Sequence, residues 1–501
     1  MATTTTPQRS LSEPQLLYIG GRYQRSSDGA TFSVRNPMTG SVIYDCASAS
    51  VDDYATAIDT AHEAYQSWSR TSPTARRLVF LKAADIMESY VSGDVPELLS
   101  QEVSATKHWV GVNIHATANL FRETAGLVTH IKGEIIPADR PGTTILVERQ
   151  AVGVVFAISP WNAPINLTAR AIACPLICGN TVVLKPSELS PRSQDVVVRA
   201  LAAAGLPPGC LNFLPTNTER TPQVTEYAVK HPQVLRVNFT GGDRVGRIIA
   251  GWAATCLKQC VLELGGKAPV LVLDDADIDD AVEAVVFGAL SNAGQICMST
   301  ERVLLHRSIS GEFKARLLKK VEGLKCGNHE EDPDVSISGL ITPGSATRVV
   351  DLVKVAVAGG ASLLIGDMKI TGPNNTIVGP HILEGVTPDM DIAHKESFGP
   401  VMILSEFDTD EEAIASANST DYSLCASVFS RDVMRAVDVA RQVRVGACHV
   451  NGPTVYVEAP LPNGGTGGGS GYGRFGGMAG VEAFTERKII TLARPGMKFH
   501  F

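Results

Sequence analysis

The chain has 501 residues, of which 44% are hydrophobic and 19% charged, a composition typical of a large globular enzyme with two or three domains. Its net charge of -8 at pH 7 provides no basic field, so we expect neither nucleic acid nor a membrane as a partner. The ten cysteines form no C-x-x-C pair, which argues against metal sites and favours reduced thiols in the cytoplasm. The start, MATTTTPQRSLSEPQ, lacks the apolar core of a secretory signal, although its Thr, Ser and Arg content leaves a mitochondrial address as the weaker alternative.

Helical patterns dominate before Lys132, notably over 51–69 and 72–90, and the apolar strand pattern TTILVER follows at 143–149. From Ala151, the run AVGVVFAI, an amphipathic stretch to Cys178 and the run TVVLK predict a strand, a helix and a strand. Further helices are predicted over 193–204, over 219–231 and from 244, alternating with the strands LNFL, VLRVNFT and VLEL. A second series starts at PVLVL, includes a helix after 277 and a strand over 302–306, and ends near 449. Such alternation predicts an α/β fold with doubly wound parallel sheets.

Two side chains within this pattern have the chemistry of an active site. Cys297 lies in NAGQICMSTER between a predicted helix and a predicted strand, where it is either a nucleophile or a small buried hydrophobe. Glu263 ends the apolar strand of VLELGGKAP beside two glycines, where it is either a general base or a structural charge satisfied by backbone N–H groups. Neither residue identifies the reaction alone.

A third candidate, Asn162, follows a predicted strand in ISPWNAP, on the side of a parallel sheet where ligands bind. Its amide is able to donate to an oxyanion, but it is also suited to stabilising the turn between Trp161 and Pro164. Taken alone, the turn is the commoner role for such an asparagine.

Two further loops have features of a nucleotide site. In VNFTGGDRVGRI, Gly241 and Gly242 precede a helix that contains Gly246, so free N–H groups there are suited to a phosphate. In VVLKPSE, Lys185 and Glu188 provide a positive charge and an acceptor suited to ribose hydroxyls. Both stretches are equally compatible with ordinary turns between a strand and a helix.

Taken in order, these stretches resemble the aldehyde dehydrogenase superfamily, from about Tyr18 onward. The resemblance rests on motifs in the family's order: PWNAP, VLKPSE, FTGG, LELGGKAP, GQICMSTER, KESFGP, VNGPTV, and SGYGRFGG followed by FTERK. Within the superfamily, GQICMSTER, NGPTV and GYGRFGG are most similar to dehydrogenases of aromatic aldehydes, of the salicylaldehyde and vanillin type.

The resemblance implies two doubly wound parallel-sheet domains and a small β arm. It divides the chain into a discontinuous NAD-binding domain over 1–131 and 152–263, a catalytic domain over 264–455, an oligomerisation arm over 132–151 and 478–501, and a glycine-rich loop over 456–477 at the mouth of the active site. A homodimer or a homotetramer would follow.

The resemblance also implies a mechanism. Cys297 attacks the aldehyde as a thiolate, and the Asn162 amide together with the Cys297 backbone N–H holds the resulting oxyanion. After hydride transfer to the nicotinamide a thioester remains, which Glu263 hydrolyses by taking a proton from water. The expected product is the carboxylic acid.

The cofactor positions implied by the resemblance are Lys185 and Glu188 at the adenosine ribose, Trp161 with Gly241, Gly242 and Gly246 near adenine and pyrophosphate, and Glu396 and Phe398 at the nicotinamide end. A carboxylate at Glu188 accepts from the 2′-hydroxyl of NAD but repels the 2′-phosphate of NADP, so we expect NAD, with use of NADP left open. Many relatives have Ser where this chain has Gly242, so one hydrogen bond to the pyrophosphate is expected to be missing.

The expected substrate residues are Arg170, Trp109, Ile296 and Met298. Arg170 lies eight residues beyond Asn162, on nearly the same face of the predicted helix, where it would bind a ring hydroxyl or a second oxygen substituent. Trp109 would offer a face to the ring, and Ile296 and Met298 would form walls beside the nucleophile. An exposed Arg and a core Trp remain the structural alternatives.

Two other functions remain as alternatives. A CoA-acylating dehydrogenase would pass the acyl group to CoA rather than to water, but such enzymes tend to lack the general-base carboxylate that Glu263 supplies. A non-catalytic binding protein on the same fold would usually have relaxed its chemical residues, whereas Cys297, Glu263 and Asn162 are all present.

The stretch LPNGGTGGGSGYGRFGG, 461–477, contains a G-x-G-x-x-G match at Gly471, Gly473 and Gly476. The match follows a loop rather than a strand, so a dinucleotide site is not expected here. The stretch instead resembles the family's segment beside the active-site mouth, with Asn463 where an aromatic is usual and one extra residue within 466–469. We expect a loop more mobile than in relatives and a widened channel mouth.

Overall fold

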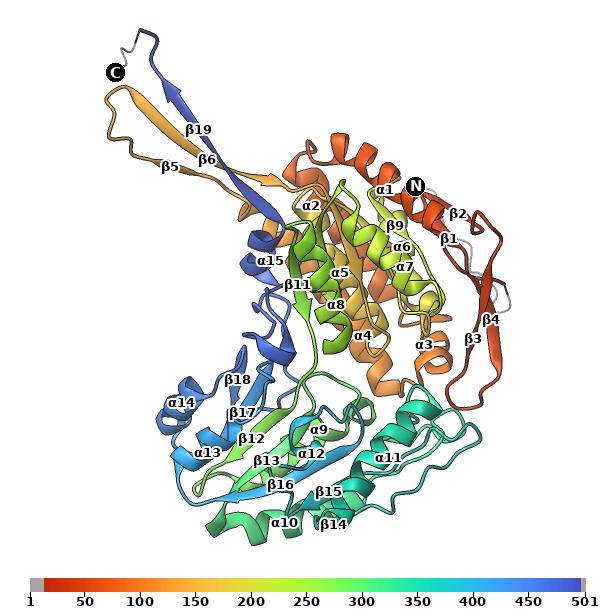
Figure 1. Cartoon of the computed structure of the whole chain (residues 1–501), viewed down its shortest axis with the longest axis vertical. Helices are drawn as coiled ribbons and strands as arrows, with labels where there is room; N and C mark the ends of the chain where they lie inside the picture. The colour runs from red at the N-terminus through yellow and green to blue at the C-terminus, as the bar shows by residue number, and fades with distance from the viewer. Residues whose placement is uncertain (1–12, 497–501) are drawn as a thin grey trace.

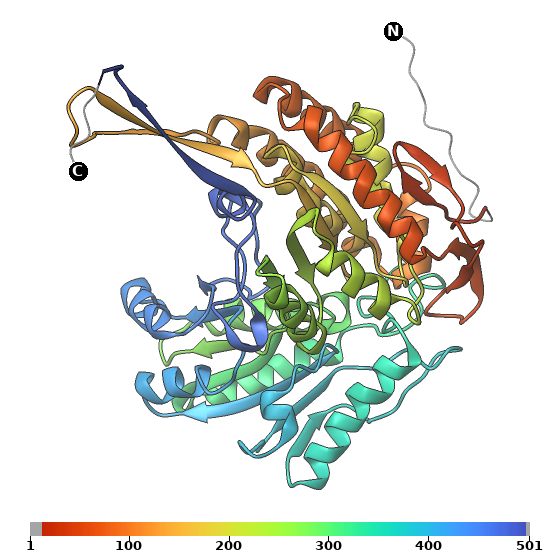
Figure 2. The same cartoon turned by 45° about the horizontal axis from the view of Figure 1, so that its top comes forward.

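The structure, a computed structural model, describes residues 13–496, so residues 1–12, where no export signal is expected, and residues 497–501 of the predicted arm lie outside the described part. Two layered α/β bodies lie one above the other, and a long antiparallel arm projects from the upper one (Figure 1). A view from a second angle shows the same arm standing clear of both bodies (Figure 2). The predicted α/β fold with two parallel-sheet domains and a small β arm is confirmed.

The first sheet has seven strands in the order β11-β10-β7-β8-β9-β1-β2. Strands β7 to β11 run parallel, whereas β1 pairs antiparallel with β9 and with β2. Parallel strands are covered on both faces, which is why β7 and β8 are continuous buried runs, VVFAI and TVVLK. The strands are β1 (Leu17–Ile19), β2 (Arg22–Gln24), β7 (Val154–Ile158), β8 (Thr181–Lys185), β9 (Leu211–Phe213), β10 (Val234–Thr240) and β11 (Gln259–Glu263).

Helices cover both faces of this sheet because successive side chains along a strand point to opposite sides. Val154 and Phe156 pack in one core with α1, α7 and α8, whereas Val155 and Ala157 pack in another with α2 to α6. The four helices predicted with both ends are found to within two residues. The helices are α1 (Val51–Trp68), α2 (Pro73–Ser89), α3 (Val95–Val103), α4 (Lys107–Gly126), α5 (Pro164–Ile177), α6 (Pro191–Ala204), α7 (Thr221–Lys230) and α8 (Asp243–Thr255).

The second sheet has the order β14-β15-β16-β13-β12-β17-β18, and only its edge strand β14 is antiparallel among the described strands. Helices α9, α10 and α11 share one core with it, and α13 and α14 share the other. The strands are β12 (Ala268–Val272), β13 (Thr300–His306), β14 (Ser362–Ile365), β15 (His381–Glu384), β16 (Val401–Phe407), β17 (Cys425–Phe429) and β18 (Ala447–Val450). The helices are α9 (Ile278–Leu290), α10 (Arg307–Glu322), α11 (Pro343–Ala358), α12 (Asp391–His394), α13 (Asp410–Ala417) and α14 (Val433–Gln442).

The arm is a three-stranded antiparallel sheet in the order β19-β6-β5, formed by β5 (Glu134–Ile136), β6 (Thr143–Ala151) and β19 (Thr485–Ala493). The helix α15 (Gly477–Ala483) leads into β19. Arg236 in the body forms an ion pair with Glu486 at the base of the arm. Strand β6 is two residues longer than the pattern TTILVER predicted, and β19 lies within the arm predicted over 478–501.

Two sequence expectations need correction. The strand expected from Ala151 begins at Val154, because Ala151 still pairs with Thr485 as the last residue of β6. The segment expected to be mainly helical also contains the strands β1 and β2 and a hairpin of β3 (Thr31–Arg35) and β4 (Val42–Ala47). Strands of three residues, such as β1, are too short to produce a period-2 pattern. No helix within residues 13–496 is long and apolar enough to cross a bilayer.

Candidate active site

A cavity of about 270 Å³ lies where the carboxyl ends of the first sheet face the second sheet's loops, and it brings many of the predicted residues together. Strands β7, β10 and β11 are parallel neighbours, so the loops that follow them meet at one edge. The predicted residues that line the cavity are Trp161, Asn162, Gly241, Gly242, Cys297, Glu396 and Phe398.

Cys297 reaches this cavity through a turn of left-handed residues. Asn292 and Ala293 have φ of +50° and +55°, and the following Gly294 has φ of +71° with no room for a Cβ, which would lie 2.1 Å from the carbonyl oxygen of Gly399. Burial raises the pKa of the Cys297 thiol well above its ordinary value, and the negative charge of Glu263 raises it further. The surroundings of Cys297 therefore favour the thiol over the thiolate.

Asn162 is tied to the cysteine loop from two directions. Its Nδ2 donates to the backbone carbonyl of Gln295 at 3.0 Å, and its own carbonyl accepts from Asn292 Nδ2 at 3.1 Å. The same carbonyl accepts from the indole Nε1 of Trp109 at 2.8 Å. Because an amide nitrogen carries two hydrogens, Asn162 retains a second donor beyond this contact with Gln295. Trp109 is buried and supports this loop, which is the core role that the sequence left open.

Glu263 is buried at the end of β11, where its side chain and its backbone carbonyl each accept a hydrogen bond. Its Oε1 accepts from Asn463 Nδ2 at 2.9 Å, and its backbone carbonyl accepts from the N–H of Gly241 at 3.0 Å. Burial raises the pKa of the carboxyl group, whereas the charge of Arg170 and the amide of Asn463 act to lower it. A carboxyl group with a raised pKa is suited to exchanging protons near neutral pH.

Arg170 on α5 lies close enough to both reactive groups to interact with them by charge. Burial lowers the pKa of its guanidinium, and the charges of Glu263 and Cys297 oppose that shift. Its Cζ lies 4.9 Å from the centre of the Phe475 ring. Thus the residue expected to bind an oxygen substituent of the ring also acts by its charge on Glu263 and Cys297. Ile296 and Met298, on either side of the cysteine, pack in the core that contains α4 and α5.

The two glycines at the start of α8 have opposite surroundings. A Cβ on Gly241 would lie 2.6 Å from the Phe239 ring, whereas a Cβ on Gly242 would meet no atom within 4 Å. On Gly246, which does not line the cavity, a Cβ would lie 2.5 Å from Leu264, so this glycine allows helix and strand to pack closely. Open space and free helix N–H groups at Gly242 fit a phosphate of a dinucleotide.

At the other end of the cavity, the rings of Trp161 and Phe398 meet edge to face with centroids 5.8 Å apart. Glu396 accepts from the N–H of Gly266 at 2.8 Å, and burial together with the charge of Glu301 raises the pKa of its carboxyl group to about 8. A planar nicotinamide ring and its ribose are compatible with these aromatic and acceptor groups.

Lys185 and Glu188 follow β8, beside the cavity but not in its lining. Lys185 is buried and its Nζ donates to the carbonyl of Pro186 at 3.2 Å. Burial lowers the pKa of its amine, and the charge of Glu188 opposes this shift. The two residues therefore act on each other at the same edge of the sheet, while their contact with a ribose stays a prediction.

Sequence reasoning missed the clamp that holds Glu396 and Phe398. Lys267 and Glu301 form a buried ion pair of 2.5 Å, and Glu301 also accepts from the backbone N–H groups of Ser397 and Phe398 at distances from 2.8 to 3.1 Å. Both charged residues stand within the quoted motifs, immediately next to the apolar runs of β12 and β13. A charge predicted at the end of a buried strand was the signal that could have identified the pair.

The glycine-rich stretch differs from its expectation as an open channel mouth. Asn463 is buried and bonded to Glu263, so it does not lie on an exposed rim. The stretch runs along β11, where Leu262 donates to Tyr472 and Leu264 to Ser470. Gly471 has φ of +78°, and a Cβ there would lie 2.2 Å from the carbonyl oxygen of Leu262. The close approach of the backbone to β11 therefore explains why position 471 is a glycine. A dinucleotide fingerprint does not explain it.

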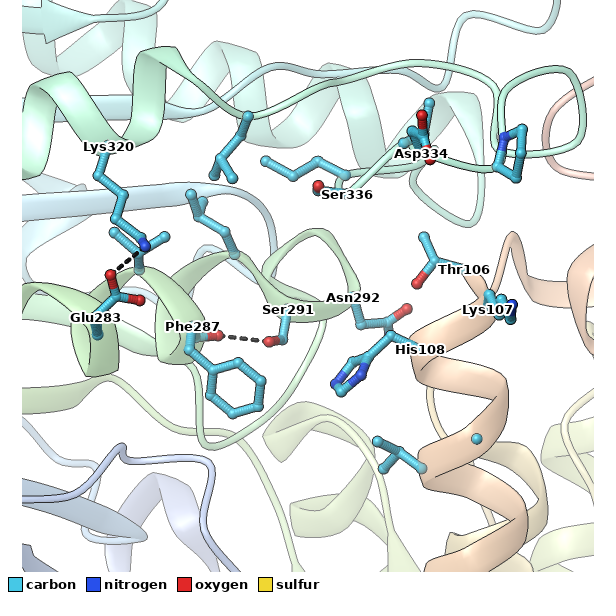
Figure 3. A pocket seen from close by; sticks show the side chains of 18 of the residues that line it. Thr106, Lys107, His108, Glu283, Phe287, Ser291, Asn292, Lys320, Asp334 and Ser336 are labelled. Atoms are coloured by element: carbon cyan, nitrogen blue, oxygen red, sulfur yellow. Dashed lines mark hydrogen bonds and ion pairs between the residues drawn. The ribbon is translucent and has the colours of Figure 1, made fainter.

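A larger cavity than the one at Cys297, of about 970 Å³, lies between α4, α9 and residues 333–337. Figure 3 shows its polar wall, with Lys320 paired to Glu283 and Ser291 donating to the Phe287 carbonyl. It contains Asn292 but none of the predicted site residues. Size alone therefore does not identify the reactive site in this protein.

Comparison with known proteins agrees with this geometry. The aldehyde dehydrogenase family model matches residues 23–490. A vanillin dehydrogenase of Pseudomonas fluorescens is 43% identical over 95% of this chain and 97% of its own length. A salicylaldehyde dehydrogenase from Pseudomonas putida G7, solved with salicylaldehyde, is 42% identical with a TM-score of 0.94, over 97% of this chain and 100% of that one. An NAD-dependent aldehyde dehydrogenase from Sinorhizobium meliloti is 31% identical with a TM-score of 0.92, over 98% and 97%. The chain belongs to the aldehyde dehydrogenase family.

Proposed function

We propose that this protein oxidises an aromatic aldehyde to the carboxylic acid with NAD as the oxidant. The observation that carries the proposal is that Cys297 and Asn162 line one cleft and that Glu263 lies close enough to act on the Cys297 thiol by its charge, in a chain whose relatives include vanillin and salicylaldehyde dehydrogenases. In this proposal the NAD-binding domain comprises residues 1–131 and 152–263, which contain the first sheet. The catalytic domain, residues 264–455, supplies the nucleophile.

The proposed nucleophile is the Cys297 thiolate, which attacks the carbonyl carbon of the aldehyde. The oxyanion formed is held by the free N–H of the Asn162 amide and by the Cys297 backbone N–H, each stabilising the transition state by roughly 3 to 4 kcal/mol. NAD, when bound, supplies the acceptor for the hydride that leaves this carbon. A thioester on Cys297 remains, and Glu263 takes a proton from the water that hydrolyses it.

The proposed NAD site joins Trp161 with Gly241, Gly242 and Gly246 near adenine and pyrophosphate, Glu396 and Phe398 at the nicotinamide end, and Lys185 and Glu188 at the ribose. The open space at Gly242 supports this assignment, since a phosphate needs room and N–H donors there. A carboxylate at Glu188 favours the 2′-hydroxyl of NAD, and NADP remains the cofactor to compare.

The proposed substrate residues are Arg170, Trp109, Ile296 and Met298. A guanidinium beside Glu263 and Cys297 is placed to meet an oxygen substituent on the ring. Ile296 and Met298 flank the nucleophile and would form apolar walls, and Trp109 would complete them while holding the Asn162 loop.

Turnover of salicylaldehyde, vanillin, benzaldehyde, hexanal and acetaldehyde with NAD tests the proposal. We expect kcat/KM to be largest for the three aromatic aldehydes and NADH to appear with an equal amount of free acid. Preference for the short aliphatic aldehydes would refute the substrate class. Formation of acyl-CoA in the presence of CoA, without free acid, would refute hydrolysis, and absence of NADH with every aldehyde would favour a binding protein.

The arm supports a homodimer or a homotetramer. Ile135, Ile489 and Leu492 are exposed on it, and β19 is an edge strand whose outer backbone groups are free to pair. Light scattering after size exclusion tests this state, and a monomer would contradict it.

All ten cysteines are free, which supports a reducing compartment such as the cytoplasm.

A further inference from the structure

The two oxygens of the Glu263 carboxyl group have different surroundings. Oε1 accepts the hydrogen bond from Asn463 Nδ2 at 2.9 Å. Oε2 is buried, and no donor within residues 13–496 reaches it. A buried carboxylate oxygen without a donor is destabilising unless another group supplies one. The water consumed by hydrolysis is such a donor. This asymmetry indicates that Oε1 holds the carboxylate in place and that Oε2 is the oxygen available to the water.

The backbone holds Asn463 rigidly. Its N–H donates to the Phe475 carbonyl at 3.0 Å, and the N–H of Phe475 donates back at 3.2 Å. This bridge closes residues 463–475 into a loop, whose Ser470 and Tyr472 carbonyls accept from β11 on either side of Glu263. The amide and the carboxylate are therefore carried by two segments that are bonded to each other.

Within residues 13–496, the ionisable groups that interact with Glu263 by charge are Arg170 from α5, Cys297 from the loop before β13, and Cys425 from β17. Glu396 acts on Cys297 in the same way. Arg170 acts through its charge and lies over the Phe475 ring, whereas the amide of Asn463 is the group in direct contact with the carboxylate. Asn463 thus fixes the position of the Glu263 carboxylate, whereas Arg170 affects the stability of its charge.

We propose that Asn463 is a positioning residue for thioester hydrolysis, which anchors Glu263 through Oε1 and leaves Oε2 to take the proton from water. The inference rests on the roles proposed above for Cys297 and Glu263. In this step Oε2 takes one proton of the water, the water oxygen bonds to the acyl carbon, and the C–S bond breaks with its electron pair on Sγ. The acid leaves as a carboxylate, its proton passing to solvent.

The first test is Asn463→Leu, which removes the donor at similar side-chain size. Rapid mixing with benzaldehyde and NAD should give a burst of about one NADH per site, then a steady rate about tenfold below that of the unchanged protein. Mass spectrometry of the acid-quenched protein should find the benzoyl group on Cys297. Because the amide favours the ionised carboxylate, the acid limb of the hydrolysis rate should move to higher pH.

Two further variants address folding. Asn463→Asp keeps the shape but places a second carboxylate beside Glu263, so it should also retain the burst and slow hydrolysis. Asn212→Leu is the matched control, since Asn212 is a buried amide in β9 that donates to the Gly209 carbonyl at 2.9 Å, remote from Glu263. It should keep the ratio of burst to steady rate.

Glu263→Gln separates this inference from the proposed function. If Asn463 acts through Glu263, adding Asn463→Leu to Glu263→Gln should slow hydrolysis no further. A further loss in the double variant, or equal losses of burst and steady rate in both Asn463 variants, would mean a merely structural role and overturn the inference. Hydrolysis at the unchanged rate in Glu263→Gln would instead remove the proposed base itself, and both proposals with it.

Discussion

The surroundings of Cys297 and Glu263 differ, although the two groups act on each other by charge. The cysteine has two acidic neighbours, Glu263 and Glu396, which add to burial in raising the pKa of its thiol, and only Arg170 opposes them. The glutamate has a cation and an amide, and both act against the effect of burial. The site therefore stabilises the charge of its base more than that of its nucleophile. One cation, Arg170, serves both groups, so its effects on attack and on hydrolysis should be linked.

The largest expected effect comes from removing the nucleophile. Cys297→Ala should lower NADH formation from benzaldehyde by about 10⁴-fold or more, because the remaining site has no group to form the covalent intermediate. Removing the thiol should leave NAD binding intact, which quenching of tryptophan fluorescence would measure. Turnover above one per cent of the original rate would assign the attack to another residue.

The next effect tests the shared cation. Arg170→Met should lower kcat/KM at pH 7 by about tenfold, with activity returning as the pH rises. The sign follows because a positive charge favours the thiolate and the carboxylate, so its loss raises the pKa of both groups. The pH profile from 6 to 10 measures this shift. Arg199→Met is the control, since Arg199 also lies over a ring, that of Tyr90 at 6.0 Å, but away from the cleft; an equal shift there would contradict the assignment.

A smaller effect is expected from weakening the support of Asn162, the proposed oxyanion donor. Trp109→Phe removes the indole N–H that holds the Asn162 carbonyl at 2.8 Å, and should lower kcat by about threefold to tenfold as the oxyanion donor loses its fixed position. Trp68→Phe is the matched control, because the buried Trp68 donates to the Leu176 carbonyl at 3.0 Å without contact to the site. Equal losses of kcat in the two variants would mean general destabilisation.

The smallest effect is expected at the turn of Gly241 and Gly242, which is proposed to hold the NAD pyrophosphate. Gly242→Ser adds a hydroxyl where a Cβ meets no atom within 4 Å, and should lower the KM for NAD by a few-fold. Gly241→Ser should do the reverse, since its Cβ would lie 2.6 Å from the Phe239 ring. Titration of NAD binding measures both, and a weaker affinity in Gly242→Ser would remove the phosphate from this turn.

The sheets were predictable because parallel strands buried on both faces leave long apolar runs separated by helical patterns. The strand β1 and the hairpin of β3 and β4 were not, because short or mixed-burial strands lack such a signal. Cys297, Glu263 and Asn162 could be identified because each stands at the end of a predicted element within a motif. Their proposed roles come from the family resemblance rather than from the pattern.

The supports of these residues could not be predicted in the same way. Asn463 is 200 residues from Glu263 and Trp109 is 53 residues from Asn162, and the contact of each pair depends on how the chain folds back. The sequence showed Asn463 only as a departure from an aromatic residue. Its burial and its partner follow from the path of residues 463–475 along β11, which composition does not reveal.

The close packing of the glycine-rich stretch bears on efforts to redesign substrate range. Substitutions at Gly468 or Gly471 should disturb the fold, since a Cβ on either would lie 2.2 Å from a backbone carbonyl oxygen. Leu167 lines the cavity from α5 and is a side chain through which the cavity's shape could be changed instead. A library directed at such side chains would sample new specificities while leaving the scaffold of the base intact.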